Sequence, residues 1–109
     1  MFRQTSKYNW IGMIKMLQDT LKALSDPTRR KILELLKQHP MSAGDIGTHF
    51  AMTGATLSHH LSVLKNAGLV LDEKKGTFIY YEINTSVMED MLNWVTGILG
   101  EGNEKDKKD

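Results

Sequence analysis

The sequence contains no cysteine, only two prolines and no long apolar run. Without cysteine the chain can form neither disulfides nor thiolate metal sites. Lys15 interrupts the short apolar run within residues 1–17, so this stretch matches neither a secretory signal nor a membrane span. We therefore expect a cytoplasmic protein.

The remaining composition is ordinary for a globular domain. The chain has 109 residues, of which 40% are hydrophobic and 25% are charged, and this predicts one domain with a small core that dimerisation would enlarge. Residues 1–75 hold 11 basic and 6 acidic side chains, whereas residues 76–109 hold 3 and 7. An anionic partner is therefore expected to meet the first two thirds of the chain, although basic segments also occur as plain solvated faces.

Two helices are indicated before residue 40. Apolar residues recur at steps of three and four over residues 8–24, which predicts a helix with a continuous apolar stripe. Asp26 followed by Pro27 combines a favoured N-cap with proline at the first helical position, and the second helix stops before Pro40. The stripe of the first helix fits either a partner chain or the rest of its own domain.

A short helix and a turn come next. The stretch from Ser42 to Asp45 resembles a capping box and predicts a short helix over residues 43–50. Two glycines, Gly44 and Gly47, make this helix marginal by itself, so it must be held by packing. Thr53 can then cap a longer helix.

The longer helix, ended by Gly68, has two contrasting faces. Leu57, Leu61 and Leu64 form a stripe that can be buried. The opposite face carries short side chains and no acidic residue: Ala55, Thr56, Ser58, His59 and Ser62. Hydroxyl and imidazole groups both donate and accept hydrogen bonds, so this face suits close contact with base edges.

The pattern then changes to strands and a final helix. Leu69–Lys75 and Phe78–Ile83 predict a hairpin. On the second strand Ile79, Tyr81 and Ile83 are expected to face inward, and Phe78, Tyr80 and Glu82 outward. Ser86-x-x-Glu89 resembles a capping box for a helix that reaches residue 99. The wide apolar face of that helix exceeds what so small a domain can cover, and this predicts a dimer surface.

This order of elements is that of a winged helix-turn-helix, a mainly α fold with a β-hairpin wing. The segments ALSDPTRRKILELLK, TLSHHLSVLKNAGLV and KKGTFIYYEIN together resemble the ArsR-type winged-helix transcriptional repressors over roughly residues 17–99. Within that family the sequence is most similar to the metal-independent autorepressors of sporulation-delay immunity operons. We predict one domain over residues 8–99, with flexible ends at residues 1–7 and 100–109.

The resemblance implies a homodimeric repressor that binds an inverted-repeat operator in double-stranded DNA, with a recognition helix in each of two successive major grooves. A protein partner that relieves repression is compatible with it, and no RNA partner is expected. The implied DNA-binding residues are Thr53, Ala55, Thr56, Ser58, His59, Ser62, Lys65, Lys74 and Lys75. The expected dimer interface comprises Trp10, Ile14, Leu17, Leu21, Val87, Met88, Met91, Trp94, Val95 and Ile98.

Several neighbouring residues have competing interpretations. We expect His60 to be packed and hydrogen-bonded, whereas His59 faces outward. Arg29, Arg30 and Lys31 are expected to be a solvated helix start rather than DNA contacts. The aromatic side chains of the second strand could form a base-stacking platform, but their spacing favours support of the core and the wing.

The resemblance also allows metal sensing to be tested on the sequence. Family members with a thiolate site carry Cys-x-Cys where this chain has Ser42 and Gly44. Members with a site on the last helix carry aspartate and histidine where this chain has Thr85, Val87 and Ile98. These residues cannot form a soft-metal or zinc site, so we expect no metal and no cofactor.

An enzyme is not expected either. Ser58 and the two histidines after it are consecutive on one helix and do not face each other, and no phosphate loop or catalytic motif is present. The main alternative is a winged helix that binds proteins and not DNA. A protein-binding face should be more apolar or carry mixed charge, so the acid-free face favours DNA.

Overall fold

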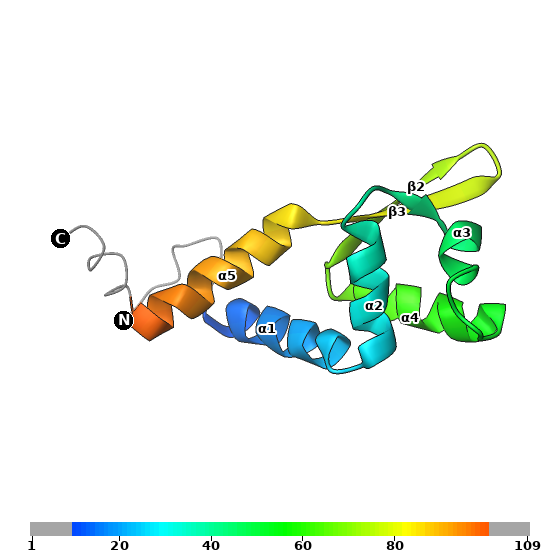
Figure 1. The fold of residues 1–109 in the computed structure, drawn as a ribbon. Coiled ribbons are helices and arrows are strands. Elements are labelled where there is room, and N and C mark those ends of the chain that lie inside the picture. Colours follow the sequence, from blue (N-terminus) through cyan, green and yellow to red (C-terminus); the bar gives the residue numbers. More distant parts are fainter. Residues whose placement is uncertain (1–9, 101–109) are drawn as a thin grey trace.

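The computed structural model describes residues 10–100, and the predicted flexible ends, apart from Gly100, lie outside this range together with Tyr8 and Asn9. Figure 1 shows a helical body from which a β-hairpin and a long last helix extend in different directions. The elements are α1 (Trp10–Leu24), α2 (Pro27–Leu36), β1 (Met41–Ser42), α3 (Ala43–Gly47), α4 (Gly54–Asn66), β2 (Val70–Lys75), β3 (Phe78–Ile83) and α5 (Thr85–Gly100). The predicted winged helix-turn-helix arrangement is confirmed.

The helix caps follow the predicted chemistry. The Asp26 carboxylate accepts hydrogen bonds from the backbone N–H groups of Thr28 and Arg29 at the start of α2. Ser42 Oγ accepts from the N–H of Asp45 at 3.1 Å and caps α3. Each cap satisfies donors that the first helical turn leaves without partners, which stabilises the helix by about 1 kcal/mol for a serine or threonine cap.

Gly68 ends α4 as predicted, and the geometry explains why. Its φ angle of 78° lies in the left-handed region, where glycine has no steric penalty. The N–H of Gly68 donates to Lys65, and the N–H of Leu69 donates to Leu64 at 3.0 Å. This pair of bonds is a Schellman motif, which turns the chain sharply out of α4 and into β2.

The core lies where α2, α3 and α4 pack against the sheet and the end of α1. Leu57, Leu61 and Leu64 are buried, which confirms the predicted inner stripe of α4. Ile46 from α3 and Leu69 from the turn after α4 are fully buried beside them. Burial of each such side chain contributes about 2 kcal/mol, and together they hold the short α3 in place.

The sheet has one more strand than predicted. It has the order β1-β3-β2, and the two-residue strand β1 pairs Met41 with Tyr81 and Ser42 with Tyr80. Tyr81 and Ile83 pack against the core, but Ile79 is 40% exposed and the prediction that it faces inward is wrong. The reason is that Ile79 lies toward the tip of the wing, beyond the reach of the core.

Two helix boundaries also differ from the prediction. Helix α3 ends at Gly47 and not at residue 50. The next residues form turns with hydrogen bonds between residues three apart, among them His49 N–H to the Ile46 carbonyl and Phe50 N–H to the Gly47 carbonyl. The last helix begins at Thr85, because Asn84 Oδ1 accepts from the N–H of Val87. The capping box predicted at Ser86 is therefore wrong, and Asn84 takes that role.

Candidate nucleic-acid interface

The predicted recognition face lies on the exposed side of α4. Thr53 Oγ1 accepts from the N–H of Thr56 at 3.1 Å and donates to Thr56 Oγ1 at 3.0 Å. This arrangement leaves the Thr56 hydroxyl hydrogen available for an outside acceptor. Ala55, Ser58, His59 and Ser62 are also exposed. The structure therefore brings all the polar residues predicted on this helix face to one surface.

His60 points to the interior, as predicted. Its side chain is 13% exposed, and its Nδ1 lies 3.1 Å from Nη1 of Arg29. A guanidinium nitrogen can only donate, so Nδ1 is the acceptor. His59, with its ring centroid 5.7 Å from that of His60, stays on the exposed face.

Asp26 lies next to the same pair, with Oδ2 4.0 Å from His60 Nδ1. Burial by itself raises the pKa of the Asp26 carboxyl. The backbone N–H groups of Arg29 and Thr28, together with the charge of Arg29, outweigh burial and hold that pKa below its ordinary value. The carboxylate is thus ionised at neutral pH, in its capping form.

The prediction of a solvated helix start is wrong for Arg29, which is half-buried, whereas Arg30 is exposed as predicted but is also bonded to α1. Arg29 Nε donates to the carbonyl oxygen of Ala23 at 2.8 Å, and Arg30 Nη1 donates to that of Leu24 at 2.7 Å. The last carbonyls of a helix lack partners within the helix, and cationic side chains satisfy them well. The signal in the sequence was the spacing: two arginines follow closely after a helix end. Lys31 is exposed, as predicted.

The lysines expected to contact phosphate differ in their surroundings. Lys65 Nζ lies 3.0 Å from Asp72 Oδ2 in an ion pair that joins α4 to β2. Lys74 and Lys75 are exposed on the wing, and Lys75 Nζ lies 5.6 Å from the centre of the Tyr80 ring. Of these three lysines, Lys65 has an acidic partner, whereas the two on the wing have none among the described residues.

A groove separates the start of α4 from the wing. Its helical side carries small residues together with Met52, Leu57 and Leu61, and its wing side carries Thr77, Phe78 and Ile79. Thr53 and Ser58 line the same groove, so recognition helix and wing share one continuous surface. Phe78 is 60% exposed there and packs edge-on to Tyr80 with ring centres 6.5 Å apart. The sequence predicted that Phe78 faces outward and supports the wing, and did not include it among the DNA-binding residues.

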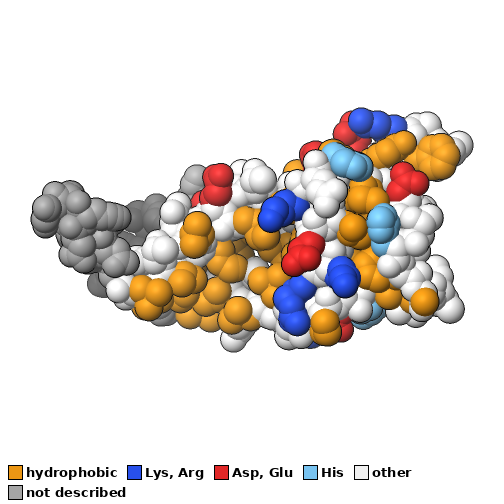
Figure 2. Space-filling model, viewed as in Figure 1, with side chains coloured by type: hydrophobic (Ala, Val, Ile, Leu, Met, Phe, Trp, Pro, Cys, Tyr) orange, Lys and Arg blue, Asp and Glu red, His pale blue; other side chains and the backbone are white. Residues whose placement is uncertain are grey.

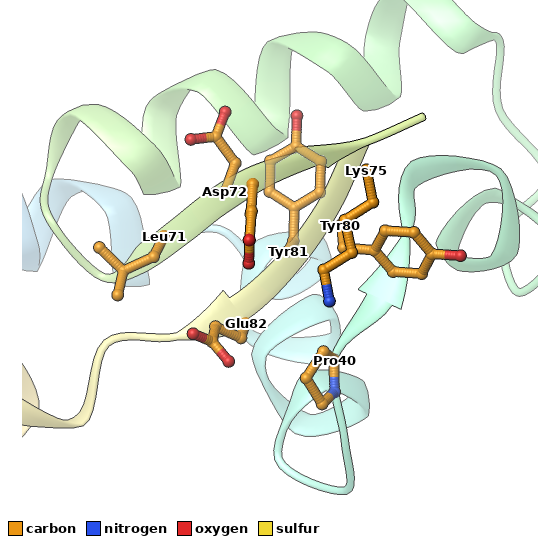
Figure 3. Close-up of a pocket in the computed structure, with 8 residues that line it drawn as sticks. Pro40, Leu71, Asp72, Lys75, Tyr80, Tyr81 and Glu82 are labelled. Atoms are coloured by element: carbon orange, nitrogen blue, oxygen red, sulfur yellow. The ribbon is translucent and has the colours of Figure 1, made fainter. Parts of the chain in front are cut away.

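A second depression lies on the sheet itself, as Figure 3 shows. Glu73, Glu82 and Asp72 lie around it, so its charge does not suit a phosphate backbone. Asp72 and Tyr81 project to the same side, in keeping with their direct pairing across β2 and β3. Burial and the charge of Asp72 raise the pKa of Tyr81, and Lys65 partly offsets this.

Apolar side chains gather over α1 and α5, away from the wing (Figure 2). Of the predicted dimer residues, Leu21, Val95 and Ile98 are exposed, whereas Val87 and Met88 pack partly against the core. Ile14, Leu17, Met91 and Trp94 are half-buried, and the side chain of Trp10 lies outside the described residues. Ile11, Leu92 and Leu99, which belong to the predicted apolar stripes but not to the predicted dimer residues, are exposed as well.

Over residues 10–100, no three histidine, cysteine, aspartate or glutamate side chains come together as a metal site would require. Ser42 and Gly44, at the positions of the family thiolates, respectively cap α3 and belong to it. None of the helices in this part of the chain is long and apolar enough to cross a membrane.

A short helix, a turn, a helix with an exposed polar face and a hairpin beside it define the class of winged helix-turn-helix proteins. The chain belongs to the family described as "Bacterial regulatory protein, arsR family", whose pattern matches residues 26–71. This is a family of regulatory proteins and not of enzymes, in agreement with the sequence prediction.

Individual relatives support this assignment. The chain is 49% identical to the transcriptional repressor SdpR of Bacillus subtilis over 86 residues, which cover 79% of this chain and 96% of SdpR. The fold is similar to an ArsR-like transcriptional regulator from Rhodococcus sp. RHA1, with a TM-score of 0.74, 29% identity and 89% of each chain covered. It is also similar to a homodimeric winged helix-turn-helix DNA-binding domain from Mycobacterium bovis, with a TM-score of 0.68, 29% identity and 91% and 90% covered.

Proposed function

We propose that this protein is a cytoplasmic, homodimeric transcriptional repressor that binds an inverted-repeat operator in double-stranded DNA without a bound metal. The observation that carries the proposal is the exposed face of α4, which is polar, free of acidic residues and continuous with the wing. Two such faces related by a two-fold axis would occupy successive major grooves about one helical turn apart. An inverted repeat matches that symmetry.

The contacts divide into those that discriminate bases and those that bind the backbone. Thr56, Ser58 and His59 lie on the exposed face of α4 and have donors and acceptors for base edges. Ala55 beside them can pack on a thymine methyl group. Thr53 and Ser62 flank this face. The Ser62 hydroxyl suits a phosphate oxygen, whereas the Thr53 hydroxyl already donates to Thr56, so Thr53 would contact phosphate through its place at the helix N-terminus.

The wing supplies charge and an apolar surface. Lys74 and Lys75 can each neutralise a phosphate, which adds affinity without sequence preference. Lys65 would contribute less, because Asp72 already pairs with it at 3.0 Å. One strand of the DNA backbone would lie in the groove between α4 and the wing, where Phe78 meets its sugars. The wing tip has no arginine to insert into the minor groove.

The dimer is supported by the exposed apolar side chains on α1 and α5. Ile98 and Leu92 are 62% and 61% exposed, and side chains of this kind on one face indicate an interaction surface. The similar domain from Mycobacterium bovis is homodimeric. A second copy that placed the same face against this one would bury both by two-fold symmetry.

Metal independence is supported by the residues at the family's ligand positions. Ser42 Oγ is occupied as the cap of α3, and Gly44 has no side chain. Thr85, Val87 and Ile98 offer no imidazole or carboxylate. We therefore propose that repression is relieved by a route other than direct metal binding.

The test is selection of bound duplexes from a random-sequence pool with the purified chain, together with its mass by light scattering. We expect enrichment of one inverted repeat and a dimer at micromolar concentration. The matched control is the Ser58→Ala/His59→Ala chain, which should bind DNA but enrich no sequence. A wild-type chain that enriches nothing would contradict DNA recognition and favour a protein-binding module, and a monomer would contradict the dimer.

A further inference from the structure

Three side chains join the end of α1, the start of α2 and the middle of α4. Arg29 Nε donates to the Ala23 carbonyl oxygen at 2.8 Å, while Nη1 of the same guanidinium lies 3.1 Å from His60 Nδ1. Asp26 Oδ2 caps α2 and lies 4.0 Å from that ring nitrogen. One guanidinium therefore contacts both α1 and α4 from its place on α2.

The contact between Arg29 and His60 is partly shielded from water by its surroundings. The His60 side chain is 13% exposed, and both Arg29 and Asp26 are half-buried. The guanidinium is planar and rigid, and its charge strengthens hydrogen bonds that are shielded from water. A fork held on Ala23 at one side and on His60 at the other fixes the angle between the two helices it joins.

The cluster is separate from the residues proposed to touch DNA. His60 follows His59 directly on α4 but points to the other side, toward α2. Figure 1 shows α2 crossing in front of α4, with α1 running away toward α5. The cluster thus lies between the proposed recognition helix and a helix that carries part of the apolar face.

We propose that Arg29 and His60 are positioning residues that set the orientation of α4 relative to α1, and through it the separation of the two recognition helices in the dimer. This inference rests on the proposed function, because separation has meaning only for a dimer on DNA. Half-site spacing follows from the distance and angle between the two recognition helices. A looser link between α1 and α4 would leave that spacing poorly defined.

Arg30 provides a matched control within the same helix. Its Nη1 donates to the Leu24 carbonyl oxygen at 2.7 Å, so it also holds the end of α1. Among the described residues it makes no hydrogen bond to α4. Arg30→Ala therefore weakens the α1–α2 junction alone, whereas Arg29→Ala also removes the link to α4.

The experiment measures affinity for the inverted repeat that the wild-type chain selects, and for versions with one base pair added or removed between the half-sites. Wild type should prefer its selected spacing. His60→Leu and Arg29→Ala should reduce that preference about tenfold, as expected for the loss of a charge-assisted hydrogen bond. Arg30→Ala should keep it. His60→Asn should restore it, because the amide oxygen can replace Nδ1 as acceptor.

The outcomes separate this inference from the proposed function. If the wild-type chain selects no duplex, the proposed function fails. If it selects one and His60→Leu, folded by circular dichroism, keeps the wild-type spacing preference, the positioning role is overturned. An equal loss in Arg30→Ala would overturn it too. Should His60→Leu not fold, Arg29→Lys decides, because lysine keeps the charge but loses the fork; an unchanged preference would then count against the inference.

Discussion

The helix-turn-helix with its wing and the pair α1 and α5 differ in how they bury apolar side chains. In the first region Ile46, Leu64 and Leu69 are fully buried within one chain. In the second, Ile98 and Leu99 are 62% and 73% exposed. The first region thus closes its core within one chain, with the end of α1 packed against it, while the second fits assembly with another copy. In the proposed dimer, core formation and association would use separate surfaces of one small chain.

The largest effect should come from the first region. Leu64→Ala removes a fully buried side chain and should lower the free energy of unfolding by about 3 kcal/mol at every protein concentration. Leu92→Ala, at a 61% exposed position, should cost stability only where the chain is dimeric. Urea denaturation at two protein concentrations distinguishes these cases. If both variants lost the same free energy of unfolding at both protein concentrations, the proposed difference between the two regions would be contradicted.

The second largest effect should come from a charge placed on the apolar face of α1 and α5, which should prevent formation of the dimer. Ile98→Asp places a carboxylate where the proposed dimer buries apolar surface, and DNA affinity should fall about 100-fold because two linked sites no longer bind together. Light scattering should show a monomer, and circular dichroism should show unchanged helix content. Gln38→Asp, at an exposed position beyond α2, is the control and should remain dimeric. A dimeric Ile98→Asp chain would move the interface elsewhere.

Smaller losses are expected on the exposed face of α4. Ser58→Ala and His59→Ala should each reduce base discrimination by about 1–3 kcal/mol without changing stability, since both side chains are exposed. Binding to the selected duplex and to single-base variants measures this. Ser86→Ala, an exposed serine on α5, should change neither quantity. Wild-type discrimination in both recognition-helix variants would show that another face contacts the bases.

The smallest effect is expected on the salt dependence of DNA binding, and it distinguishes a lysine without an acidic partner from one that has such a partner. Lys74→Ala should weaken binding to all sequences alike and reduce the salt dependence of log affinity by about one unit per protomer. Lys65→Ala should reduce it less, because Asp72 already neutralises that ammonium. Titrations at several salt concentrations provide the slopes. Identical slopes for wild type and Lys74→Ala would exclude this wing lysine from the backbone contacts.

Local patterns made most of the fold predictable. Asp26-Pro27, Ser42 and Thr53 each start a helix through bonds within three residues, so neighbours in sequence suffice to identify them. The exposed and buried faces of α4 follow from helical spacing in the same way. The cap of α5 was not predicted correctly. Asn84 and Ser86 are both residue types that favour an N-cap, and only the backbone path out of β3 selects Asn84.

The sequence could not predict contacts between residues that lie far apart along the chain. The strand β1 has two residues and exists because β3 lies beside it with Tyr80 and Tyr81 in register. The spacing of Arg29 within α2 could indicate a solvated helix start, but could not reveal a partner 31 residues away on α4. The sequence predicted Lys65 as a phosphate contact. In the structure the turn at Gly68 places Asp72 beside it, so its charge is already paired.

The sequence by itself determined the helices, the hairpin, the acid-free face of α4 and the resemblance to a regulatory family, because these depend on spacing and on local hydrogen bonds. Only the tertiary structure decided which charges are already paired, which apolar side chains remain exposed, and that one arginine joins α1 to α4. Those properties depend on distances between segments far apart in the chain, which local patterns do not specify.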